Sequence, residues 1–67
     1  MELERAKELI AQQISFGSGY NRNSVRLILG EVQREQGMHA ANLLIKAMDL
    51  ERLFDLRPGT DFTQINR

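Results

Sequence analysis

The sequence has no cysteine and no tryptophan, and it contains a single histidine and a single proline. The absence of cysteine excludes disulfide bonds and thiolate metal sites. With His39 as the only histidine, a metal site built from several histidines of one chain is excluded as well. A triad of serine, histidine and carboxylate is disfavoured, because His39 lies far along the chain from the serines within residues 15–24. We therefore predict no metal, no cofactor and no enzymatic activity.

The chain also has no excess of charge and no long apolar run. Nine basic and nine acidic residues give a net charge of zero, which disfavours a strongly basic nucleic-acid binder and electrostatic docking to a membrane. The longest uninterrupted apolar run is three residues, whereas a membrane-spanning helix needs about 20. The first residues, MELERAKE, carry both signs of charge and do not form a secretory signal. We therefore expect a cytoplasmic protein with no membrane partner.

The most informative stretch of the chain is MHAANLLIKAMDLERLF at residues 38–54, which reads as a helix with an unusually wide apolar arc. At about 100° per residue its apolar side chains cover roughly 220°, whereas an ordinary surface helix has an apolar stripe of about 100° or slightly more. Two apolar rows lie beside each other on this helix. The first row is Ala40, Leu43, Ala47, Leu50 and Phe54, and the second is Ala41, Leu44 or Ile45, and Met48.

Two apolar rows indicate two partners, one inside the chain and one outside it. A core within 67 residues supplies only about 3–5 kcal/mol of net stability, and small chains usually need a further source of stability. With disulfides and metals excluded, self-association is the remaining source. We therefore predict a homodimer, and the alternative is that this helix is the centre of a monomeric bundle. The predicted dimer interface consists of Leu43, Leu44, Ala47, Met48, Leu50 and Phe54.

The rest of the pattern is helical and predicts an all-α fold, a small three-helix bundle that is completed by homodimerisation. A single domain spans residues 1–67. Helices are expected over about 2–16, 24–36 and 39–54, and the loop GSGYNRNS at 17–24 separates the first two.

Small residues and apolar spacing suggest how these helices meet. Leu3, Ile10 and Ile14 share one face of the first helix, which we expect to pack against the other two. Gly37 is expected to end the second helix as its C-cap. Gly30 costs about 1 kcal/mol relative to alanine within a helix, and it would permit a close crossing there.

Three points stay open at the level of the sequence. The VRLIL run at residues 25–29 has some strand character, because β-branched and apolar residues alternate there. The second and third helices could form one bent helix over 24–54. The tail at 58–67 is either frayed or docks onto the bundle through Phe62 and Ile65.

The loop before the second helix has a local positive charge, because residues 9–30 contain Arg22 and Arg26 and no acidic residue. Backbone N–H groups at the start of a helix also bind anions. The Gly-Lys-Ser/Thr ending of a P-loop is absent, so an ordinary interhelix loop is the favoured interpretation. The residues that would contact an anion or a nucleic acid are Tyr20, Arg22, Asn23 and Arg26.

These observations favour a non-catalytic regulatory or adaptor protein that acts by protein–protein interaction as a helical homodimer, with a further protein partner. The alternative is a DNA-associated transcriptional regulator, with a helix-turn-helix-like unit around Gly37. The helix that would read the DNA is mostly apolar, and Lys46 is its only basic residue before Arg52. Few of its side chains are left to contact base edges, so nucleic acid is the less favoured partner.

Overall fold

The computed structural model describes residues 1–16 and 21–64, and these residues form helices joined by short connections, without any strand. The elements in chain order are α1 (Leu3–Ser15), α2 (Asn21–Gln36), α3 (Met38–Ala47), α4 (Leu50–Phe54) and the 3-10 helix η1 (Phe62–Gln64). The predicted all-α fold class is thus confirmed for the described residues, with four α-helices there in place of three. None of these helices combines the length and apolar character needed to cross a bilayer.

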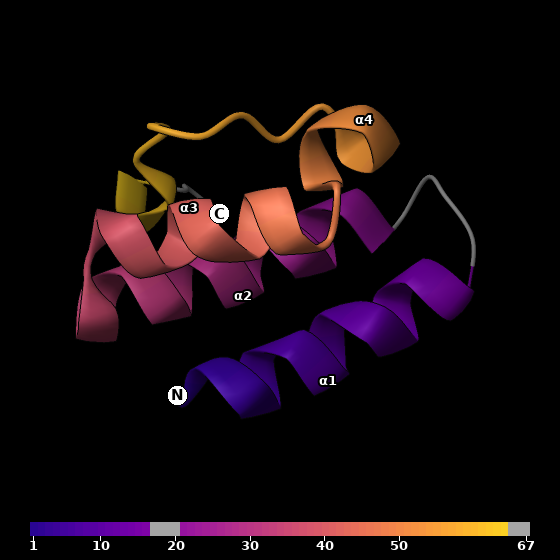
Figure 1. Cartoon of the computed structure of the whole chain (residues 1–67), viewed down its shortest axis with the longest axis horizontal. Coiled ribbons are helices and arrows are strands. Elements are labelled where there is room, and N and C mark those ends of the chain that lie inside the picture. Colours follow the sequence, from indigo (N-terminus) through magenta and orange to yellow (C-terminus); the bar gives the residue numbers. More distant parts are fainter. Residues whose placement is uncertain (17–20, 65–67) are drawn as a thin grey trace.

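Helix α2 is the centre of the arrangement, because α1, α3 and η1 all pack against it (Figure 1). Ile10 of α1 is fully buried, and Leu3 and Ile14 pack against the same core, as the spacing on this helix predicted. Val25 and Leu29 of α2 are fully buried four residues apart, which is the spacing of one helical face. The strand alternative for the VRLIL run is therefore excluded.

Helices α2 and α3 are separated by Gly37 alone. Its φ of 95° lies in the left-handed region, where glycine has no steric penalty. Its amide N–H donates to the carbonyl of Gln33 at 2.9 Å and closes the last turn of α2. The bent helix over 24–54 is thus excluded. At its other end α2 begins at Asn21, three residues before the expected start, so Asn23 lies inside the helix.

The helix predicted over 39–54 is broken in two, which corrects that expectation. Helix α3 ends at Ala47, and Asp49 adopts a left-handed conformation with a φ of 58° before α4 begins. Aspartate is among the few non-glycine residues that tolerate this region. The turn redirects the chain, and both Leu50 and Phe54 of α4 are buried in the core.

The C-terminal segment returns along the bundle after a second left-handed aspartate, Asp55, with a φ of 59°. It runs back past α3, and η1 lies on α2 (Figure 1). Phe62 is only 3 % exposed, so its predicted docking is confirmed, whereas Ile65 lies outside the described residues. The amide N–H of Gly59 also donates to the side-chain oxygen of Asn42 on α3 at 2.8 Å.

Two residues of α2 hold this segment in place. The side chain of Gln33 is buried and uses both ends of its amide: Nε2 donates to the Thr60 carbonyl at 2.9 Å, and Oε1 accepts from the Phe62 amide at 2.6 Å. A Cβ atom at Gly30 would lie 2.8 Å from the Phe62 carbonyl oxygen. Gly30 thus permits a close approach, of η1 onto α2.

The core is completed within one chain. Ala41 and Ile45, from the second apolar row of α3, are at most 2 % exposed. The accessible surface is 4392 Å², and globular monomers of this mass, 7.7 kDa, expose about 4300 Å². The wide apolar arc of residues 38–54 is therefore covered mainly by α1, α2 and the chain's own C-terminal part.

Candidate functional site

The residues predicted for a dimer interface fall into two groups. Leu44, Leu50 and Phe54 belong to the core of the single chain and are 2 %, 0 % and 7 % exposed. These three side chains are therefore little accessible to a second chain while the core of the single chain stays closed. Leu43 is 48 % exposed, and Ala47 is exposed one helical turn further along α3. We call this exposed pair, Leu43 and Ala47, the Leu43 face.

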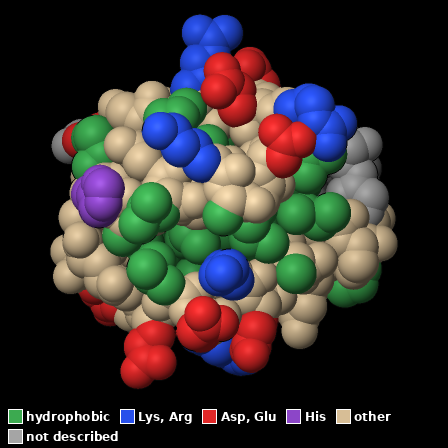
Figure 2. Space-filling model, viewed as in Figure 1, with side chains coloured by type: hydrophobic (Ala, Val, Ile, Leu, Met, Phe, Trp, Pro, Cys, Tyr) green, Lys and Arg blue, Asp and Glu red, His purple; other side chains and the backbone are tan. Residues whose placement is uncertain are grey.

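The surroundings of the Leu43 face are apolar at the centre and charged at the border. Hydrophobic side chains gather over α3 and along its boundary with α1, on the broadest side of the molecule (Figure 2). Acidic and basic side chains border this band on both sides (Figure 2). Met48, the sixth residue of the predicted interface, is half-buried and packs against the core. This arrangement suits contact with another protein surface.

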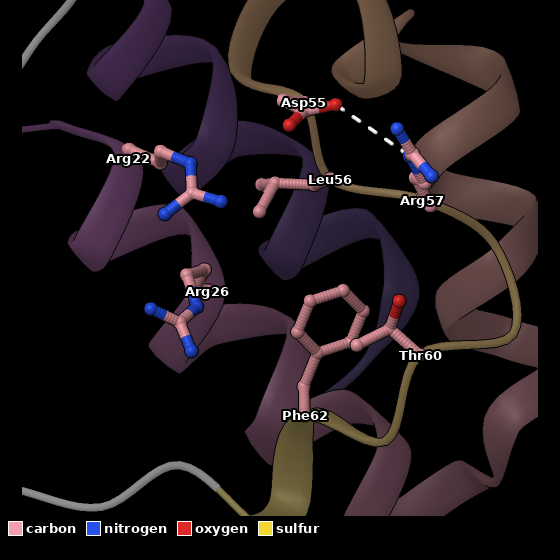
Figure 3. Close-up of a pocket in the computed structure, with 7 residues that line it drawn as sticks. All are labelled: Arg22, Arg26, Asp55, Leu56, Arg57, Thr60 and Phe62. Carbon is pink, nitrogen blue, oxygen red and sulfur yellow. Dashed lines mark ion pairs between the residues drawn. The ribbon is translucent and has the colours of Figure 1, made fainter.

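A second candidate site is a pocket between α2 and the C-terminal segment. Its volume is about 220 Å³. We call it the arginine pocket. It is lined by Arg22, Arg26, Asp55, Leu56, Arg57, Thr60 and Phe62 (Figure 3).

The pocket has two polar walls and an apolar floor. Arg22 and Arg26 are four residues apart on α2, so their side chains project from the same side of the helix. Arg57 and Thr60 come from the C-terminal segment and lie across from them (Figure 3). Leu56, which is 2 % exposed, and the equally buried Phe62 lie between these walls.

The three guanidinium groups have different partners. Nε of Arg22 donates to the carbonyl oxygen of Phe54 at 2.7 Å, which ties the start of α2 to the end of α4. Arg57 is exposed and forms an ion pair with Asp55 at 3.6 Å. Arg26 is half-buried, and no hydrogen bond or ion pair joins it to any residue that the structure describes.

Of the residues predicted to contact an anion, Arg22 and Arg26 are brought together. Asn23 is exposed on α2 and does not line the pocket. Tyr20 lies outside the described residues. The sequence did not indicate the lining residues from 55–62, because they are about 30 positions away. The only signal for them is the Pro58–Gly59 pair, which marks a turn that can send the chain back.

Other side chains that could bind a metal ion or transfer a proton lie on the surface. His39 is exposed in the first turn of α3, and Glu2, Glu4 and Glu8 are all exposed on or beside α1. Within residues 1–16 and 21–64, no three histidine or acidic side chains come together as a metal site would require.

The connection of α2 to α3 bears on the helix-turn-helix alternative. The two helices pack side by side and run in opposite directions (Figure 1). Helix-turn-helix units have their helices at about 90–120°. Ala40, Ala41 and Leu44 of α3 are buried against the chain. The antiparallel arrangement of this hairpin thus differs from that of a helix-turn-helix unit.

Known proteins supply no guide to either site. No protein-family model, no curated protein and no solved structure matches this sequence.

Proposed function

We propose that this chain is a non-catalytic protein-binding module of the regulatory or adaptor kind, and that it acts as a homodimer through the Leu43 face. The observation that carries the proposal is the exposed apolar pair of the Leu43 face on α3. Leu43 keeps about half of its surface in water, whereas Leu44 and Ile45 beside it on α3 are buried. Contiguous exposed apolar surface of this kind is typical of interaction sites.

A second copy of the chain is the occupant that the charges favour. The net charge is zero, so two copies do not repel each other over long range. A two-fold symmetric contact pairs the same patch on both chains. Because both signs of charge border the apolar band (Figure 2), such a contact lets acidic groups of one copy meet basic groups of the other.

The broad side of the molecule that carries the Leu43 face offers room for a dimer contact. The Cα atoms extend over 27 by 25 Å in the plane of the broad face. Standard protein–protein interfaces bury about 800 Å² per partner, so a contact of standard size centred on the Leu43 face would extend over most of this side. Each chain already buries its own core, so a single chain is expected to fold without its partner. The proposed dimer is therefore reversible.

Sedimentation equilibrium of the full chain, from low to high micromolar concentration, tests this proposal. We expect the wild-type protein to dimerise and Leu43→Glu to remain monomeric, because two carboxylates would meet across the two-fold contact. Leu27→Glu is the matched control, since Leu27 is 60 % exposed on α2 and outside the Leu43 face. It should dimerise like the wild type. Circular dichroism should show the same helix content for all three.

Two results would overturn the proposal. One is a wild-type protein that stays monomeric at high micromolar concentration. The other is equal dissociation by Leu43→Glu and Leu27→Glu, which would place the contact elsewhere or show a general effect of added charge.

A further inference from the structure

We propose that the arginine pocket binds a small molecule that carries a phosphate monoester group. The pocket shares no residue with the Leu43 face, so this proposal does not depend on the proposed homodimer. Four features support it: the charge balance of the lining residues, their hydrogen-bond donors, the apolar floor and the limited volume.

The charge of the pocket matches a dianion. Arg57 is neutralised by Asp55 at 3.6 Å, so Arg22 and Arg26 supply two positive charges that no lining acid balances. A phosphate monoester carries about −1.5 to −2 at pH 7. A carboxylate carries only one negative charge and would leave one guanidinium unbalanced.

The donors are available and partly pre-oriented. A guanidinium has five N–H donors in a planar fork that fits phosphate oxygens. The bond from Nε of Arg22 to the Phe54 carbonyl fixes that side chain and uses one donor. Arg26, half-buried and without a partner among the described residues, has its whole fork free. The Thr60 hydroxyl on the opposite wall is a further donor.

The floor and the volume point to a small ligand with an apolar part. Leu56 and Phe62 lie between the arginines and the opposite wall, and the small part of each that stays exposed can contact a small ring or aliphatic group (Figure 3). The volume of about 220 Å³ lies below the roughly 300–1,000 Å³ of sites for drug-sized molecules.

A nucleic acid fits this site less well than a small phosphate ester. Nucleic-acid binders present a basic stripe or patch that follows the phosphate backbone. Along α2 the next arginine after Arg26 is Arg34, which pairs with Glu31 at 3.9 Å. On α2, the positive charge without an acidic partner is thus confined to the pocket.

The test is a titration of the full-length, ¹⁵N-labelled protein with phenyl phosphate, followed by NMR through backbone amides and the arginine Nε–H signals. We expect saturable shifts at Arg26, Arg22, Thr60 and Phe62. Inorganic phosphate should bind more weakly, because it does not contact the apolar floor. Benzoate, which has the same ring and a single charge, should bind at least fivefold more weakly than phenyl phosphate.

Matched variants of α2 locate the site. Arg26→Gln should weaken phenyl phosphate at least tenfold. Arg34→Gln is the same change two turns further along the helix and should leave the affinity within twofold of the wild type. Arg26→Lys, which keeps the charge and loses the fork, should fall between them. Circular dichroism of each variant confirms the helix content, and sedimentation should show the wild-type association state.

Each of the following outcomes would overturn the assignment. One is that phenyl phosphate at millimolar concentration causes no saturable shift in the pocket. Another is that Arg34→Gln weakens the binding of phenyl phosphate as much as Arg26→Gln does. A third is that benzoate binds as tightly as phenyl phosphate, which would make the site a general anion site. A fourth is that a single-stranded oligonucleotide binds more tightly than phenyl phosphate and that its binding depends on Arg26. This outcome would assign the pocket to nucleic acid.

Discussion

Gly30 lies in the interior of α2, where glycine is the less stable choice by about 1 kcal/mol relative to alanine. The structure shows what this glycine allows. The backbone of Phe62 crosses α2 so closely that a Cβ atom at position 30 would lie 2.8 Å from its carbonyl oxygen. The neighbouring Gln33 then binds the same backbone through both ends of its amide. One small and one polar residue thus dock the C-terminal segment.

The sign of the change in the free energy of unfolding caused by Gly30→Ala tests this docking. Helix propensity alone would make alanine stabilising by about 1 kcal/mol. Because the obstructing atom belongs to the backbone and cannot rotate away, we expect a net loss of about 1–3 kcal/mol in the free energy of unfolding. Urea denaturation measures the loss, and hydrogen exchange at the Phe62 amide should become faster. A more stable variant would show that η1 does not pack on α2 in solution.

At the scale of elements, local periodicity located most of the helices and missed one break. The apolar spacing from Leu43 to Phe54 continues without interruption, so it predicts one helix. The break depends on Asp49, which is left-handed, and a single aspartate is a weak signal for such a turn. What decides the turn is burial, since only the redirected chain brings Leu50 and Phe54 into the same core.

The same limit applies to the arginine pocket. Arg22 and Arg26 could be paired from the sequence, because four residues make one helical turn. Their opposite wall comes from Arg57 and Thr60, which reach the pocket only through the left-handed turn at Asp55. A contact between residues about 30 positions apart leaves no signal in the local apolar pattern. This half of the site therefore could not be predicted from the sequence.

The turn between α3 and α4 yields a prediction that separates conformation from charge. Alanine in the left-handed region costs about 1–2 kcal/mol, so Asp49→Ala should destabilise the protein by about 1 kcal/mol. Asparagine tolerates the left-handed region, so Asp49→Asn loses only the exposed ion pair with Arg52. Such a pair contributes at most about 1 kcal/mol and often less. Thermal and urea unfolding should therefore place Asp49→Asn close to the wild type. Equal losses in the two variants would assign the effect to the ion pair.

At the scale of the whole molecule, the width of the apolar arc had two explanations. Either a second chain covers part of the arc, or the chain covers the whole arc itself. The burial of Ala41, Ile45 and Leu44 favours the second explanation for most of the arc. Leu43 and Ala47 are the part that stays exposed. The fold should consequently be independent of association, and the proposed dimer should be a weaker contact between two finished folds.

Two neighbouring leucines test this separation of folding from association. Leu44 is 2 % exposed, and Leu44→Glu would bury an unpaired charge at a cost that exceeds the roughly 3–5 kcal/mol available to so small a core. We expect this variant to lose its helical circular dichroism at every protein concentration. Leu43→Glu should stay folded, because the new carboxylate remains in water.

The concentration dependence of the melting temperature completes this test. A ligand or partner that binds only the folded state raises Tm as its concentration rises. We therefore expect Tm of the wild type to rise modestly with protein concentration, whereas Tm of Leu43→Glu should stay constant at the value of the dilute wild type. If Leu43→Glu were instead unfolded at low concentration, the single chain would not be a finished fold, and the core would need the partner after all.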